Sequence, residues 1–235
     1  MDTIDIQPDA AALAHHVAGW LTDRAVAKSG PFTVCLSGGS TPKAMFEALA
    51  SEPHRSRFPW ARTHIFFGDE RFVPPDHPDS NARMARLAML DHVPVPADQV
   101  HAWPTDTTLE DCVARYAQTL RDWYGADTLD PARPLFDVMF LGLGEDGHTA
   151  SLFPGVAALQ ERRAWTAAVV GAKPEPRLTL TYPVLDSAGV VAFLVAGAAK
   201  QAILARVLAR DPALPASGVH AAGDMVWFTD RAANS

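Results

Sequence analysis

The sequence predicts an α/β fold, in which a mostly parallel sheet carries helices on both faces. Short segments that are apolar throughout, such as FTVCL at 32–36, are typical of strands buried on both faces of a sheet. Segments with helical spacing lie between these strands, and such alternation is typical of parallel sheets. With 235 residues, 48% of them hydrophobic, the chain can bury a substantial core. Since no long linker divides it, we expect one domain over residues 1–235.

The first expected element is a helix over 8–28, where Leu13, Val17 and Leu21 recur at every fourth position. Ser80 is a candidate N-cap for a later helix, because a serine hydroxyl can accept a hydrogen bond from a free N–H of the first turn. Apolar runs predict further strands at 64–68, 135–143, 177–182, 190–197 and 225–229, and helical spacing predicts helices at 42–50, 80–90, 109–124 and 200–209.

The composition argues against several classes of protein. A formal net charge of -7 is unlike a nucleic-acid binder, although an anionic small substrate needs only a local positive patch. The two cysteines, Cys35 and Cys112, are far apart, so we expect neither a disulfide framework nor a thiolate metal site, and a reducing cytoplasm fits. The first residues are acidic rather than basic, and no apolar run reaches the roughly 20 residues of a membrane span. We therefore expect a cytoplasmic location and no membrane partner.

Ligands of parallel α/β sheets bind beyond the carboxyl ends of the strands, so we expect the functional residues in the loops there. The first such loop reads SGGST, from Ser37 through Gly38, Gly39 and Ser40 to Thr41. Glycines allow close approach of backbone N–H groups, and Ser40 or Thr41 could cap a helix whose start favours an anion. An ordinary strand-to-helix turn explains the loop equally well. This loop matches neither the Walker A pattern nor G-x-G-x-x-G, which disfavours a nucleoside triphosphate or a dinucleotide as its ligand.

The second loop places Asp69, Glu70 and Arg71 directly after the strand HIFFG. Three charged residues at such a place are often a solvated turn. Alternatively, Arg71 could bind an anionic or carbonyl oxygen, and Asp69 could accept from sugar hydroxyls or hold a catalytic water. The spacing does not choose between these roles.

The third loop, GLGEDGHTASLFPG, carries His148 out of an apolar strand. A carboxylate near an imidazole, here Asp146, can fix its tautomer, and a histidine that titrates near neutrality can act as a general base on water. No histidine pair has metal-ligand spacing, so we expect no metal. Ser151 is a poor candidate nucleophile because the G-x-S-x-G elbow is missing.

Two basic residues complete the set of candidates. Arg177 opens the strand RLTLTY, and Lys200 begins the helix after VVAFLVAG; the chain has only four lysines. Each could simply be an exposed charge at the end of an element. If the loops converge, however, Arg177 and Lys200 would complete a phosphate pocket with the loop at 38–41.

The blocks LSGGSTPKAMFEAL, FFGDERFVPPDHPDSNARMA, FLGLGEDGHTASLFPG, RLTLTYPVL and GAAK resemble, in their order, the signature blocks of the glucosamine-6-phosphate isomerase/6-phosphogluconolactonase family, and of its lactonase branch in particular. The resemblance implies a modified Rossmann-like α/β domain. It implies an enzyme that hydrolyses 6-phosphogluconolactone, the second step of the oxidative pentose phosphate pathway, without a cofactor and as a monomer. It also implies roles for residues: phosphate binding by Gly39, Ser40, Thr41, Arg177 and Lys200; the sugar and water side of the cleft for Asp69, Arg71 and Asn81; and general base catalysis by His148 with Asp146 beside it.

Two rival functions were weighed against hydrolysis. In the related deaminases the resembling histidine loop ends in Ala-Phe-Asn-Glu-Pro, and its glutamate assists ring-opening and isomerisation. Here the loop continues HTASLFPG and offers no glutamate. The second rival is a non-catalytic sugar-phosphate sensor. A sensor normally carries a DNA-binding segment, but the helix at 8–28 has little basic charge, and sensing needs no base at His148.

Overall fold

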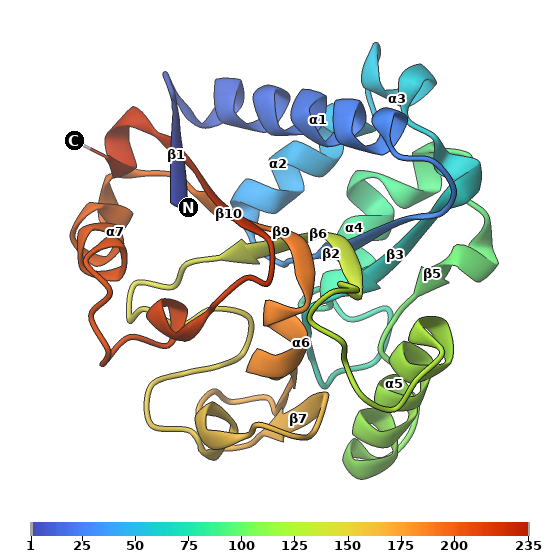
Figure 1. Cartoon of the computed structure of the whole chain (residues 1–235), viewed down its shortest axis with the longest axis vertical. Coiled ribbons are helices and arrows are strands. Elements are labelled where there is room, and N and C mark those ends of the chain that lie inside the picture. The colour runs from blue at the N-terminus through green and yellow to red at the C-terminus, as the bar shows by residue number, and fades with distance from the viewer. Residues whose placement is uncertain (1, 235) are drawn as a thin grey trace.

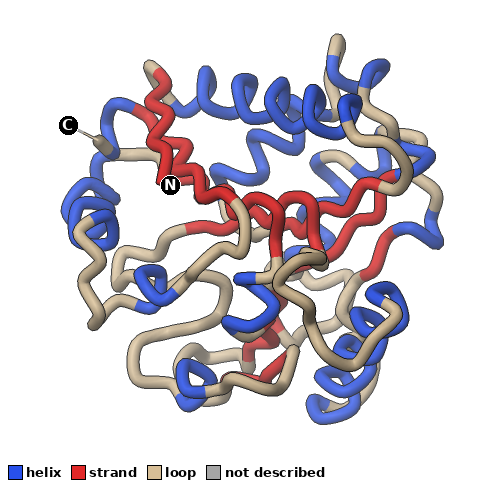
Figure 2. Tube along the Cα trace, viewed as in Figure 1, coloured by secondary structure: helices blue, strands red, loops and turns tan. Residues whose placement is uncertain are grey.

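The computed structural model describes residues 2–234, and its main feature is a seven-stranded sheet that crosses the middle of the molecule (Figure 2). Every pair of neighbouring strands in this sheet is parallel. Two of its members, β1 and β5, do not follow from the sequence, because β1 is a largely exposed edge strand without an apolar run and β5 is only two residues long. In spatial order the strands are β1 (Asp2–Gln7), β10 (Asp224–Asp230), β9 (Ala188–Val195), β6 (Phe136–Gly142), β2 (Phe32–Leu36), β3 (Thr63–Phe67) and β5 (Val100–His101).

Helices cover both faces of this sheet, which confirms the predicted fold class. In Figure 1, α1 (Ala10–Ala27) and α2 (Ser40–Leu49) lie above the sheet, and α5 (Leu109–Tyr124) and α6 (Tyr182–Asp186) lie below it. The predicted helix at 109–124 is confirmed at both ends: Thr108 caps its start and Gly125 ends it in the left-handed conformation. The remaining α-helices are α3 (His54–Arg57), α4 (Asn81–Ala88) and α7 (Gln201–Leu208).

A second, three-stranded antiparallel sheet corrects one expectation. The predicted strand at 177–182 exists as β8 (Arg177–Leu180), but it lies outside the parallel sheet, between β4 (Asp69–Arg71) and β7 (Thr166–Val169). β4 was expected to be a loop because all three of its residues are charged. Its pairing with β8 shows that long-range hydrogen bonding overrides the low strand propensity of these residues.

The start of α2 also differs from the prediction. Ser40 and Thr41 are its first two helical residues rather than its N-cap, so the predicted serine or threonine cap is wrong. Gly39 occupies the cap position with φ of 109°, a conformation that favours glycine. Ser80, in contrast, is confirmed as the N-cap of α4, since its hydroxyl accepts from the backbone N–H of Arg83 at 3.1 Å.

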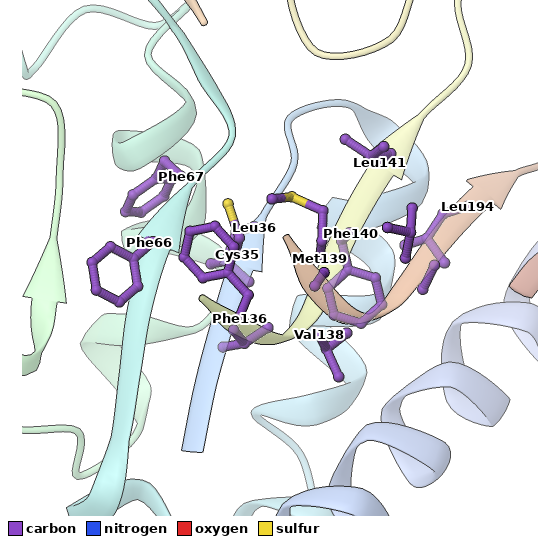
Figure 3. Packing of buried hydrophobic residues seen from close by; sticks show 14 of the residues in the cluster. Cys35, Leu36, Phe66, Phe67, Phe136, Val138, Met139, Phe140, Leu141 and Leu194 are labelled. Carbon is purple, nitrogen blue, oxygen red and sulfur yellow. The ribbon is translucent and has the colours of Figure 1, made fainter. Parts of the chain in front are cut away.

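The central strands form a tightly packed core beneath the loops. Every residue of β2 is buried, as expected for a strand covered on both faces. Figure 3 shows how this core is shared: Phe66 and Phe67 come from β3, Phe136 and Phe140 from β6, and Leu194 from β9. Because dense packing holds the ends of these strands in place, the loops that leave them start from fixed positions.

Two histidines lie against one another at the β3–β5 edge of the sheet. Nδ1 of His64 is 3.2 Å from Nε2 of His101, and the ring of Trp123 lies 3.9 Å from that of His64. Burial lowers the pKa of both imidazoles, and the charge of His64 further lowers the pKa of His101, while Asp98 acts in the opposite direction. A contact of this kind allows only one proton between the two nitrogens.

This pair predicts a loss of stability in mild acid. In the unfolded chain both imidazoles take up a proton below their ordinary pKa of about 6.5, whereas the folded chain resists that uptake. The free energy of unfolding is therefore expected to fall as the pH drops below that value. The measurement is urea unfolding between pH 8 and pH 5. In His64→Phe, which keeps a ring on Trp123, the dependence should be shallower; an unchanged dependence would contradict the prediction.

Candidate active site

The order of the strands places a crevice between β2 and β6. From β2 the chain continues to β3 and β5 on one side, whereas β6 pairs on the other side of β2 and is followed outward by β9 and β10. The loops after β2 and β6 therefore leave the sheet in opposite directions, which is where open α/β sheets bind ligands. A cavity of about 240 Å³ lies there.

Most of the predicted site residues line this cavity, although they come from four separate loops. Ser40 and Thr41 do not line it; they form the first turn of α2 directly after Gly39. Asp146 and Arg177 do not line it either. Asp146 is hydrogen-bonded to His148, and Arg177 pairs with Arg71 in the β4–β8 ladder. The predicted residues that line it are Gly38, Gly39, Asp69, Arg71, Asn81, His148 and Lys200.

His148 is held in one orientation by Asp146. The ring Nδ1 is hydrogen-bonded to Oδ1 of Asp146, and the backbone N–H of His148 donates to the same oxygen at 3.1 Å. The ring of Phe153 packs against the imidazole, with 4.6 Å between centroids. Partial burial works to raise the pKa of Asp146, but the hydrogen bonds from His148 outweigh it and lower that pKa below its usual value. With Nδ1 engaged as the donor, Nε2 is left with a lone pair that can take a proton.

Gly144 makes this histidine conformation possible. A Cβ at this position would lie 2.0 Å from Nδ1 of His148 and 2.8 Å from Oδ1 of Asp146. The loop also closes on itself, because the N–H of Gly144 donates to the carbonyl of His148 at 2.9 Å. The glycine-rich stretch therefore allows the imidazole to fold back over its own loop.

Asp69 and Asn81 form a fixed pair that lines the cavity. Nδ2 of Asn81 donates to Oδ1 of Asp69 at 3.1 Å and to the carbonyl of Asp69 at 3.0 Å. The Asn81 amide also occupies the space that a side chain at 38 would need, since a Cβ on Gly38 would lie 2.1 Å from its Oδ1. Gly38 is thus required by a neighbouring side chain, whatever its backbone does for a ligand.

Glu70 is a functional neighbour that the sequence did not single out. It is only 2% exposed, and its carboxylate accepts the N–H groups of Asn81 and Ala82, at 2.6 and 2.8 Å, and the hydroxyl of Ser80. Burial raises its pKa, although these backbone hydrogen bonds act against the rise. An acid that precedes a helix start by about ten residues carries little signal in the sequence, but here it holds the first turn of α4, and with it Asn81, beside Asp69.

Two basic residues, Arg71 and Lys200, line the cavity, and a third, Arg177, lies next to Arg71. Arg71 and Arg177 are directly opposite one another in the β4–β8 ladder. Burial and the charge of Arg71 lower the pKa of Arg177. Its buried Nη1 lies 3.8 Å from Oε2 of Glu175 but makes no hydrogen bond among the described residues. Lys200 lines the cavity from the end of a short 3₁₀ helix, Ala198–Lys200. Together with the N-terminus of α2, these groups favour an anionic ligand.

Comparison with known proteins identifies the family of this chain. The family described as glucosamine-6-phosphate isomerases/6-phosphogluconolactonase matches residues 8–227, which is most of the sequence. The chain belongs to this family.

Relatives from the glucosamine-6-phosphate isomerase/6-phosphogluconolactonase family match along the whole chain. A 6-phosphogluconolactonase of Nostoc sp. is 44% identical over 241 residues, covering 99% of this chain and 97% of the relative. The crystal structure of a 6-phosphogluconolactonase from Thermotoga maritima is 28% identical with a TM-score of 0.84, covering 98% of this chain and 100% of the other. A monomeric glucosamine-6-phosphate deaminase shares the fold at 20% identity, with a TM-score of 0.81 and 98% of each chain covered.

Within residues 2–234, histidine, cysteine, aspartate and glutamate side chains form no group of three or more that could hold a metal ion. Over the same residues, every helix is too short or too polar to span a bilayer.

Proposed function

We propose that this member of the family hydrolyses 6-phospho-D-glucono-1,5-lactone to 6-phospho-D-gluconate, the second step of the oxidative pentose phosphate pathway. The observation that carries the proposal is that His148 and the glycine loop at 38–39 face one cavity together with Lys200. A general base and an anion-binding helix start therefore lie within reach of the same small phosphorylated sugar. The curated lactonase of Nostoc sp. supports the choice of substrate.

The mechanism follows from the roles these groups can take. The substrate phosphate binds at the start of α2, with Lys200 and Arg177, and this places the lactone carbonyl beside His148. Nε2 of His148 takes a proton from a water, whose oxygen attacks C1. Negative charge develops on the carbonyl oxygen, where Arg71 or a backbone N–H of the glycine loops stabilises it. The bond between C1 and the ring oxygen then breaks, and the departing oxygen takes the proton back from the imidazolium.

The deaminase-like alternative meets a specific obstacle in the histidine loop. The fold is common to lactonases and deaminases, so it does not discriminate between them. At the place where the deaminase loop offers its glutamate, this chain has Phe153, which is 5% exposed and packs on the His148 ring. An aromatic ring supplies no acid for isomerisation, and lactone hydrolysis needs only one base.

We further propose that the protein works as a single domain, as a monomer in the cytoplasm, on a small-molecule substrate. Cys35 and Cys112 are both buried and unpaired, which fits a reducing compartment. The net charge of -7 supports a small-molecule substrate over nucleic acid.

A coupled assay tests the reaction. Freshly prepared 6-phosphogluconolactone is supplied, and formation of 6-phosphogluconate is followed above the spontaneous rate. Acid release that depends on the protein supports the lactonase. Release of ammonia from glucosamine 6-phosphate, without lactonase activity, would support the deaminase instead, and binding of sugar phosphates without turnover would support a sensor.

Removing a phosphate-binding cation should weaken substrate binding more than turnover. For Arg177→Ala or Lys200→Ala we expect KM to rise roughly ten- to hundredfold, the effect of one hydrogen bond to a charged group, with kcat little changed. Steady-state kinetics measures both constants. Lys43→Ala is the matched control, because Lys43 also lies near the start of α2 but is half exposed and pairs with Glu47 at 3.4 Å. Equal effects in Lys43→Ala and Lys200→Ala would contradict the phosphate pocket.

A further inference from the structure

Ser151 is a buried polar residue for which the mechanism above has no role. It lies three residues after His148, is 1% exposed, and does not line the cavity. Its hydroxyl donates to Oδ2 of Asp69 at 2.8 Å, and its backbone N–H donates to the hydroxyl of Thr179 at 3.2 Å. The loop that carries His148 is thereby tied to the carboxylate of Asp69, which lines the same cavity.

Both carboxylate oxygens of Asp69 are held by donors from the protein. Oδ2 accepts from Ser151 and Oδ1 accepts from Asn81 at 3.1 Å. Two donors on opposite oxygens fix the plane of the carboxylate. A carboxylate has about four acceptor positions, so acceptor capacity remains after these two bonds. Asp69 itself lines the cavity, where that capacity is open to a ligand.

We propose that Ser151 is a positioning residue for substrate recognition: it holds the Asp69 carboxylate in the orientation that accepts hydroxyl groups of the sugar. This proposal rests on the proposed lactonase function. The single hydroxyl proton of Ser151 is used in the bond to Asp69, and Ser151 does not line the cavity. The serine therefore acts through Asp69 and does not attack the substrate itself.

The proposal predicts which kinetic constant responds. Sugar hydroxyls are donors in the ground state and in the transition state alike, so an acceptor for them contributes uniform binding. Loss of the Ser151 hydroxyl leaves the Asp69 carboxylate free to rotate about the bond that Asn81 still makes. Affinity for the polyhydroxylated substrate should fall, while proton transfer by His148 continues.

The experiment compares Ser151→Ala with the wild type in kcat and KM, and in calorimetric affinity for 6-phosphogluconate. We expect KM and the dissociation constant to rise about tenfold, as for one charge-assisted hydrogen bond, with kcat changed by less than about threefold. Thr149→Ala is the matched control. Thr149 is also 1% exposed and in the same loop, but its hydroxyl donates to the carbonyl of Gly142 at 2.9 Å, so KM should stay close to that of the wild type.

A double-mutant cycle separates positioning from a general structural role. If Ser151 acts through Asp69, adding Ser151→Ala to Asp69→Ala should leave KM unchanged. Additive effects, equal shifts in KM for Ser151→Ala and Thr149→Ala, or a large fall in kcat at constant KM would each overturn the inference while the lactonase assignment stands. A wild-type protein without lactonase activity would overturn the proposed function and this inference with it.

Discussion

Replacement of His148 by alanine is expected to lower kcat by about 10²–10⁴-fold, the usual contribution of a general base, while KM changes little. The imidazole is the group in the cavity whose free nitrogen can take a proton from water, because its other nitrogen is engaged by Asp146. In the proposed mechanism, substrate affinity depends on the groups around the phosphate and on Asp69, and these stay in place when the ring is removed. The measurement is steady-state kinetics with fresh lactone, corrected for spontaneous hydrolysis.

His92→Ala serves as the matched control for this prediction. His92 is exposed, and its ring bonds only to the carbonyl of Leu87 within its own segment, so the substitution should leave both constants unchanged. Near-normal turnover in His148→Ala would remove the base from the mechanism. A large rise in KM with unchanged kcat would instead place His148 among the binding groups.

The histidine loop illustrates how far sequence alone could predict this site. An apolar strand followed by glycines, an acid and a histidine was enough to place His148 at the carboxyl end of β6 and to choose it over eight other histidines. The strand pattern also predicted that this loop and the glycine loop after β2 would share an edge of the sheet, and both line the same cavity. These features depend on residues close together in the chain, which is why periodicity and local spacing could indicate them.

The features that were missed depend on contacts between distant segments. β4 forms because β8 pairs with it, and no residue of Asp-Glu-Arg indicates that partner. Glu70 was read as part of a solvated turn, but the first turn of α4 folds over it and supplies its hydrogen bonds. From the sequence, Ser151 is only a candidate nucleophile. Its hydrogen bond to Asp69 joins residues 82 positions apart, and local spacing does not indicate such a contact.

The sequence indicates that the glycines of these loops matter, but it gives only part of the physical reason. Gly38 was expected to let backbone N–H groups approach a phosphate, and that role stays a prediction. The structure adds a steric demand: Asn81 fills the space beside Gly38, and the His148 ring fills the space beside Gly144. A sequence pattern shows that a residue is small, but the neighbour that requires it to be small becomes visible only in the fold.

Gly38→Ala is accordingly expected to damage both the stability of the protein and the binding of substrate. A Cβ there would lie 2.1 Å from Oδ1, 2.6 Å from Cγ and 2.8 Å from Nδ2 of Asn81, so the whole amide must move. Asn81 is 3% exposed and has little free space, and overpacking of this kind costs about 1–3 kcal/mol of unfolding free energy. Displacing the amide also removes one donor from Asp69, so KM should rise with the loss of stability. Urea unfolding and steady-state kinetics measure the two effects.

Removing the Asn81 amide tests whether it is the cause of this destabilisation. In the background of Asn81→Ala, the same Gly38→Ala change meets no amide and should cost little further stability, a non-additive result expected only for residues in direct contact. Gly142→Ala is the control for size, because its added Cβ would have only an ordinary contact, 3.7 Å from Oγ of Ser37. If Gly38→Ala destabilises the Asn81→Ala variant as much as it destabilises the wild type, the clash with the Asn81 amide is not the cause. If it destabilises only in the presence of Asn81, the amide that holds Asp69 is the reason for glycine at this position.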